Sequence, residues 1–139
     1  MSANRVAPLA LVLLLAVGCG DSASGPPGES TPGPTVDVTG TWSGTWLSSH
    51  GMGGAMSCAL TQTGGHVSGT ITIGGSPCFS AGNISGTVSA NNLDTGALFG
   101  GNIEVDFAGT VVGNDMSGSY TTVQAGACTG DTGTWQASR

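Results

Sequence analysis

The amino-acid sequence predicts an all-β fold, an eight-stranded antiparallel up-and-down β-barrel, and three observations support this prediction. A five-residue pattern recurs after residue 36, in which an apolar residue is followed by a small residue, Gly, Thr or Ser, and a second apolar residue. Short connections rich in Gly and Asn separate several of the copies. The tetrapeptide "TGTW" stands near both ends of this repeat region, at 39–42 and 132–135.

The repeated pattern predicts β-strands. Its copies are "VTGTW" (38–42), "WSGTW" (42–46), "VSGTI" (67–71), "ISGTV" (84–88), "FAGTV" (107–111) and "MSGSY" (116–120). Successive side chains of a strand point to opposite faces, so the apolar ends and the Gly share one face and the Ser or Thr positions share the other. This alternation is typical of strands with one buried and one solvated face. We expect eight strands, at 37–47, 55–63, 66–74, 83–90, 92–99, 102–112, 115–123 and 131–138.

The connections predict how these strands are joined. The segments "TGG" (63–65), "ANN" (90–92) and "GND" (113–115) are short and turn-rich, as tight hairpins require. Consecutive antiparallel strands joined in this way favour an up-and-down barrel, in which the first strand pairs with the last. The two "TGTW" copies would then line the seam where the barrel closes. A two-sheet β-sandwich fits the same alternation and is the alternative fold.

The N-terminal residues 1–18 predict a signal peptide. One basic residue, Arg5, precedes a nine-residue apolar run at 9–17, which is too short to span a bilayer. The run ends in "AVGC" (16–19), which resembles the lipobox of bacterial lipoproteins, although Ala16 stands where Leu is commonest. The resemblance implies that Cys19 becomes the first residue and carries the lipid. An ordinary secretory signal, cut near Ser24, is the alternative.

The lipobox implies a location and sets the domain boundaries. Residues 19–35 are rich in Pro, Gly and Ser and predict a flexible tether, and residues 36–139 form the barrel domain. We expect a protein of the bacterial cell envelope, held at the outer membrane or the cell surface by its N-terminal lipid. The chain has two Arg, no Lys and eight acidic residues, for a net charge of -6. This composition excludes nucleic acid as a partner.

The start of the predicted barrel resembles the first strand of the calycins, the group of lipocalins and avidins. Lipocalins have Gly-x-Trp at this place, matched here by Gly40 and Trp42, and an Arg of the last strand packed over the Trp, a role that falls to Arg139. The biotin-binding residues that follow in avidins have no counterpart in "SGTWL" (43–47). The resemblance therefore implies a barrel shape and no particular ligand.

The predicted strand directions place one binding surface. The long loops 48–54, 75–82 and 124–130 share the end opposite the tether, and loops on a rigid scaffold commonly carry function. We expect a small apolar ligand, or a protein partner, to bind at this end. The expected lining of the barrel mouth is Trp46, Met56, Ile73, Phe99 and Ile103. The alternative is a structural envelope lipoprotein whose barrel is plugged by these side chains and binds no small molecule.

The cysteines predict a disulfide between Cys78 and Cys128, which lie in two loops at the same end and outside the cytoplasm. Cys58 has the inward parity of its strand and is expected to be a buried residue. A Cys58–Cys78 disulfide is the alternative. No Cys-x-x-Cys spacing occurs, so we predict neither a metal site nor a cofactor.

Residues for catalysis are not evident, and we predict that the protein is not an enzyme. No known nucleophile, zinc, phosphate or dinucleotide motif occurs. His50 and His66 fall at opposite ends of adjacent strands, and Asp115 and Asp131 are interpreted as turn residues. A set of outward-facing acids predicts a solvated face, with a Ca²⁺ or acid–base site as the alternative: Asp94, Glu104 and Asp106.

Overall fold

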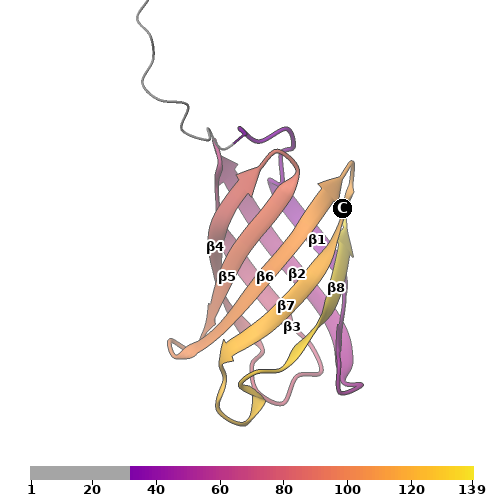
Figure 1. Cartoon of the computed structure of the whole chain (residues 1–139), viewed down its shortest axis with the longest axis vertical. Coiled ribbons are helices and arrows are strands. Elements are labelled where there is room, and N and C mark those ends of the chain that lie inside the picture. Colours follow the sequence, from indigo (N-terminus) through magenta and orange to yellow (C-terminus); the bar gives the residue numbers. More distant parts are fainter. Residues whose placement is uncertain (1–31) are drawn as a thin grey trace, which may run out of the picture. The chain divides into compact units, whose positions relative to one another are not determined.

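The computed structural model describes residues 32–139, which form a closed antiparallel barrel (Figure 1). The predicted signal peptide, Cys19 and most of the tether lie outside the described residues. The strands are β1 (Gly40–Ser48), β2 (Gly53–Thr63), β3 (His66–Ile73), β4 (Ala81–Ser89), β5 (Asn92–Phe99), β6 (Ile103–Val112), β7 (Asp115–Gln124) and β8 (Thr132–Ser138). Each strand pairs with the next, and β8 returns to β1. The prediction of an up-and-down barrel is confirmed, and the sandwich alternative is excluded.

The seam between β1 and β8 contains the second "TGTW" copy but leaves the first outside its paired residues, so the prediction that both copies line the seam is confirmed only in part. Trp46 of β1 is paired with Trp135 of β8, and the pairing of the two strands ends with Ser43 opposite Ser138. The second copy therefore lies in the seam, whereas residues 40–42 of the first belong to β1 before its pairing with β8 begins. Because these strands are antiparallel, Trp42 lies beyond Ser43 and Ser138, the last residue pair of the seam. The residue opposite Trp135 is Trp46, which is the second Trp of "WSGTW".

The first strand begins three residues later than expected. The backbone before Gly40 pairs with the Gln62 side chain and not with a strand. Val38 N–H donates to Gln62 Oε1 at 2.9 Å, and Gln62 Nε2 donates to the carbonyl of Val36 at 3.1 Å. Val38 is fully buried, so this short segment closes the barrel at the end where the chain enters. We call this end the entry end.

The Gly of the repeated pattern lets neighbouring strands approach closely. A Cβ atom on Gly44 would lie 1.8 Å from the carbonyl oxygen of Gln136, and one on Gly118 would lie 1.8 Å from that of Ala108. A Cβ on Gly86 would lie 2.1 Å from the carbonyl oxygen of Asp94. Such contacts are forbidden, so these positions require Gly where the sheet bends to close.

The entry end carries the contact that the lipocalin resemblance implies. The guanidinium carbon of Arg139 lies 4.5 Å from the centroid of the Trp42 ring, which is a cation–π contact. Arg139 also donates to the carbonyl of Thr39 at 2.8 Å, and Trp42 Nε1 donates to that of Val38 at 2.8 Å. The last residue of the sequence is thus tied to the segment that precedes β1.

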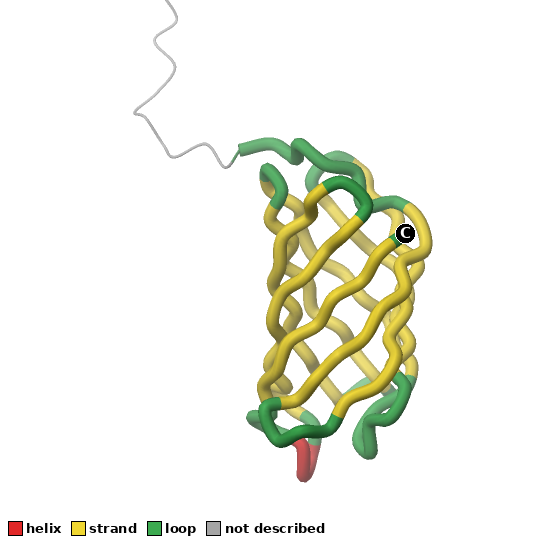
Figure 2. Tube along the Cα trace, turned by 90° about the vertical axis from the view of Figure 1, so that its right-hand side faces the viewer, coloured by secondary structure: helices red, strands yellow, loops and turns green. Residues whose placement is uncertain are grey.

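The two ends of the barrel differ, as Figure 2 shows. At the entry end the connections are the tight turns at 64–65, 90–91 and 113–114. The opposite end, called the loop end, carries the segments 49–52, 74–80, 100–102 and 125–131. The last of these includes the 3₁₀ turn Gly126–Cys128. The predicted grouping of the long loops at one end is confirmed.

Candidate functional site

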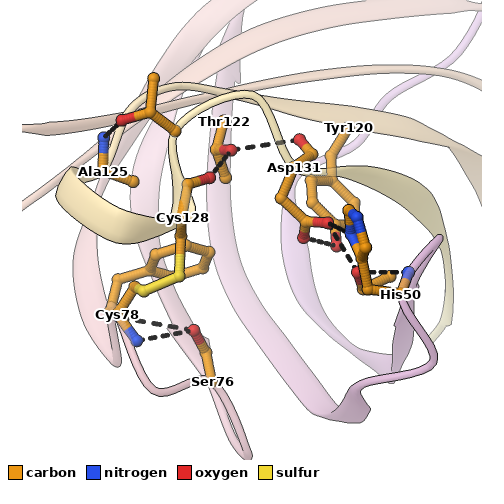
Figure 3. Close-up of a disulfide and its surroundings, with 11 residues drawn as sticks. His50, Ser76, Cys78, Tyr120, Thr122, Ala125, Cys128 and Asp131 are labelled. Atoms are coloured by element: carbon orange, nitrogen blue, oxygen red, sulfur yellow. Dashed lines mark hydrogen bonds and ion pairs between the residues drawn. A yellow bond between two sulfur atoms is a disulfide. The ribbon is translucent and has the colours of Figure 1, made fainter.

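A disulfide joins two loops of the loop end (Figure 3). Cys78 of the β3–β4 loop is bonded to Cys128 of the β7–β8 loop, at a separation of 50 positions in sequence. The predicted pair is confirmed, and the alternative Cys58–Cys78 pair is excluded. Cys58 is a free thiol, 4% exposed, and burial raises its pKa to about 11. It is therefore an unreactive core residue.

Asp131 is the centre of a second set of contacts at the loop end. Its Oδ1 accepts hydrogen bonds from Ser48 Oγ at 2.6 Å and from His50 Nδ1 at 2.9 Å, and its Oδ2 accepts one from Tyr120 at 2.8 Å. The side chain is 13% exposed. Asp131 lies in the β7–β8 connection, as predicted for a turn residue, but its carboxylate has a further role, because it connects the end of β1 and the β1–β2 loop to β7.

The charges of these groups agree with the hydrogen bonds. Burial alone would raise the pKa of Asp131, but the hydrogen bonds from Ser48, His50 and Tyr120 outweigh it, and the pKa is lowered. Burial, together with the hydrogen bond to Asp131, raises the pKa of Tyr120 to about 12. At neutral pH Asp131 is therefore a carboxylate that accepts, and Tyr120 a phenol that donates.

The residues Ser48, His50 and Asp131 do not form a nucleophilic triad. Ser48 Oγ donates its proton to Asp131 and accepts from the backbone N–H of His50 at 3.0 Å. Its side chain is also buried. In a working triad the His would accept the Ser proton, and its other nitrogen would face the carboxylate. Here the arrangement orients His50 and leaves Ser48 unactivated.

His50 is held with one ring nitrogen free. Asp131 is ionised, so Nδ1 of His50 must carry the hydrogen of their 2.9 Å contact. In the neutral ring, Nε2 then has a free lone pair. The side chain is 73% exposed, so this lone pair is accessible to a ligand.

A cleft runs beside His50 between the β1–β2 and β7–β8 loops. Its volume is about 360 Å³. Met52, whose residue is 39% exposed, lines the cleft together with His50. We call it the loop-end cleft, and its lining is His50, Met52, Ala127, Cys128, Thr129, Gly130 and Asp131. Both loops were predicted to share the loop end, but the sequence gives no signal that a cleft forms between them.

The predicted mouth residues lie near the loop end, as part of a packed core. Trp46, Met56, Ile73 and Phe99 are each at most 5% exposed, and Ile103 is partly buried. The ring of Phe79, from the β3–β4 loop, stacks on Phe99 with 4.7 Å between centroids.

The space among these residues is small. A cavity lined by Trp46, Ile73 and Phe79, with Val105, Phe107 and Tyr120, has a volume of about 10 Å³. A second, which Met56 and Cys58 help to line, has the same volume. A cavity of this size holds at most one water molecule. This barrel is filled. The filled interior favours the alternative prediction, a barrel plugged by its own side chains that binds no small molecule, over the prediction of an apolar ligand inside the barrel.

The remaining sequence candidates stay apart from the cleft. His66 is exposed at the entry end, where β3 begins. Within residues 32–139, no group of three or more His, Cys, Asp and Glu side chains is arranged to hold a metal ion. The acids of β5 and β6 line one outer wall without forming such a group: Asp94, Glu104 and Asp106. In the same part of the chain no helix has the length and apolar character needed to cross a membrane.

Comparison with known proteins supports the fold. No protein-family model matches the chain. No curated protein matches it either. Among solved structures, a redesigned β-barrel is similar with a TM-score of 0.56 and 17% sequence identity, over 73% of this chain and 90% of that one. At this identity the likeness concerns the barrel fold alone.

Proposed function

We propose that the protein is a lipid-anchored binding module, located outside the cytoplasm, that presents the loop end of its barrel to a partner molecule. The observation that carries this proposal is the contrast between interior and loops. The interior is filled, whereas the Cys78–Cys128 disulfide and the hydrogen bonds of Asp131 hold three loops of the loop end together. Loops held in one conformation bind with a smaller loss of conformational freedom.

The exposed apolar side chains support a protein as the partner. Among residues 32–139, five large apolar residues are exposed, and four of them lie on or beside the loop end: Leu47, Met52, Leu98 and Val123. The fifth, Val112, lies next to a tight turn of the entry end. The four at the loop end come from β1, β5, β7 and the β1–β2 loop, so they are spread around the rim of the loop end, where a protein large enough to cover that end would contact them. Residues 32–139 contain one Arg and no Lys, so contact with a partner relies little on cations of this chain.

The proposed anchor is consistent with this orientation. We propose from the sequence that residues 1–18 are a signal peptide, that Cys19 carries the lipid and that residues 19–35 form the tether. The proposed location is the bacterial cell envelope. The described chain enters the barrel at the end opposite the loops (Figure 1). A membrane anchor that precedes residue 32 would therefore leave the loop end free for a partner.

A catalytic role is not proposed. Ser48 is buried and its proton is engaged by Asp131, so it cannot act as a nucleophile in this arrangement. The acids of the outer wall stand on an open strand surface, where no side chains enclose a substrate. The scarcity of basic residues, two Arg and no Lys against eight acids in the whole sequence, argues against nucleic acid as the partner.

The proposal is tested by photocrosslinking in cells that naturally make the protein. A photoreactive amino acid placed at Leu98, on the loop end, should give a discrete crosslinked partner. The same amino acid at Val112, equally apolar but at the entry end, is the matched control and should give none. The variant Cys19→Ser should appear in the soluble fraction, while the unchanged protein stays with the membrane. Equal crosslinking at both positions would exclude the loop end as the binding surface, and a soluble unchanged protein would exclude the anchor.

A further inference from the structure

We propose that the loop-end cleft binds a soft monovalent metal ion, Cu(I) or its redox-inert analogue Ag(I), through Nε2 of His50 and the thioether sulfur of Met52. This inference deepens the proposed function, because it names a ligand of the same loop-end surface. It depends on neither the lipid anchor nor the identity of the protein partner.

His50 has the arrangement of a metal-binding imidazole. Metal-binding His residues usually donate their other ring N–H to a carboxylate or a carbonyl, which sets the tautomer and the orientation of the ring. Asp131 fills this position, 2.9 Å from Nδ1 of His50 (Figure 3). Asp131 is held in turn by Ser48 and Tyr120, so the whole support of the imidazole is already formed.

Met52 brings a second donor to the same cleft. The loop that carries both residues is a tight turn, in which Ser48 N–H donates to the carbonyl of Met52 at 2.7 Å and Gly51 N–H donates to that of Ser48 at 3.0 Å. Gly51 has a φ of 86°, a conformation that Gly adopts without strain. The turn therefore fixes the backbone of His50 and Met52 on one wall of the cleft, while the flexible Met52 side chain can adjust to an ion.

The donor set selects the type of metal. Imidazole and thioether together suit Cu(I), whereas Zn²⁺ sites normally need three or four protein ligands and Ca²⁺ needs six or more oxygens. Residues 32–139 offer no group of three His, Cys, Asp or Glu side chains for such ions. Cys128 lines the cleft, but its sulfur is bonded to Cys78, which leaves Met52 as the sulfur donor.

The test is a metal titration of the full chain carrying Cys19→Ser, which removes a competing thiol outside the described residues. Cu(I) is kept reduced with ascorbate under nitrogen, which spares the disulfide, and is competed with a chromogenic Cu(I) chelator. We expect one equivalent to bind, with affinity at least tenfold weaker in His50→Ala and in Met52→Leu. The matched control His66→Ala, at the entry end, should bind as the parent does. Equal binding by the parent and both cleft variants, or no binding at all, would overturn the proposal.

A second comparison tests whether Asp131 supports metal binding by positioning His50 or only by stabilising the loop end. Asp131→Asn removes the carboxylate behind His50 and should weaken Ag(I) binding roughly tenfold, the effect usual for such supporting residues. Ser76→Ala removes two hydrogen bonds of the β3–β4 loop, at the same end but outside the Asp131 contacts, so its affinity should stay unchanged. Equal losses in the two variants would show that general loosening of the loop end is responsible and would overturn the role of Asp131. None of these results alters the crosslinking at Leu98, so the two proposals fail separately.

Discussion

At the scale of single residues, Asp131 connects several segments of the loop end. An ionised carboxylate that is largely covered needs donors, and here Ser48, His50 and Tyr120 supply them. Two of these donors are 83 and 81 residues away in sequence. One side chain thus connects the beginning and the end of the barrel at the loop end, and as a charged carboxylate it can accept from all three donors at once.

This dependence on charge gives a pH prediction. The folded state lowers the pKa of Asp131, so the carboxylate stabilises the fold fully above its unfolded pKa of about 3.9. That stability is lost as the pH falls below this value and through the folded pKa. The difference in unfolding free energy between wild type and Asp131→Asn should therefore be on the order of 1–3 kcal/mol at pH 7 and should shrink by pH 3.

Urea unfolding at the two pH values measures this difference. Asp94→Asn is the matched control, because Asp94 is an exposed acid on the outer wall. It should change the unfolding free energy little at either pH. A difference for Asp131→Asn that is the same at pH 7 and pH 3 would contradict the role given to the charge.

At the scale of the strands, the repeated Gly determines how the barrel bends. The apolar residues of the pattern fill the interior, but the Gly between them marks places where the next strand passes too close for any side chain. The pattern was interpreted as an inward face with small residues. The structure adds that the space beside Gly44 is occupied by the backbone of β8, at the seam itself.

Gly44→Ala should therefore destabilise the barrel. The new Cβ would lie 1.8 Å from the carbonyl oxygen of Gln136, so β8 must move away from β1. We expect a loss of about 1–3 kcal/mol in unfolding free energy, the usual range for overpacking. Gly74→Ala is the matched control, because its Cβ would find no atom nearer than 3.5 Å. Equal melting temperatures of the two variants would contradict the role given to close approach at the seam.

At the scale of the whole molecule, a filled interior separates this barrel from one that carries a ligand inside. Three Trp, three Phe and the Tyr all lie in or against the core, and the two interior cavities measure about 10 Å³ each. Binding is thereby left to the outside of the molecule. There the loop end has locked loops, exposed apolar residues and an accessible imidazole.

A filled interior also makes a prediction for apolar probes. Wild type should show no saturable change of Trp fluorescence when titrated with small apolar molecules. Phe99→Ala should open a cavity beside Phe79 and Trp46 at a cost of roughly 3–5 kcal/mol, and this variant should respond saturably. The matched control Leu98→Ala changes an exposed neighbour and should behave like wild type. Saturable quenching in wild type would show that the interior opens in solution.

The sequence by itself determined the eight strands, their up-and-down order, the seam and the Cys78–Cys128 pair. These features follow from local signals: apolar residues at every second position, turn residues between the strands, and the alternating strand directions, which assign each loop to one end of the barrel. The filled interior, the Asp131 contacts and the close approach at Gly44 were decided only by the tertiary structure. Each depends on how side chains and strands from distant parts of the chain meet, because volume and hydrogen-bond partners are properties of the closed barrel and not of any one strand.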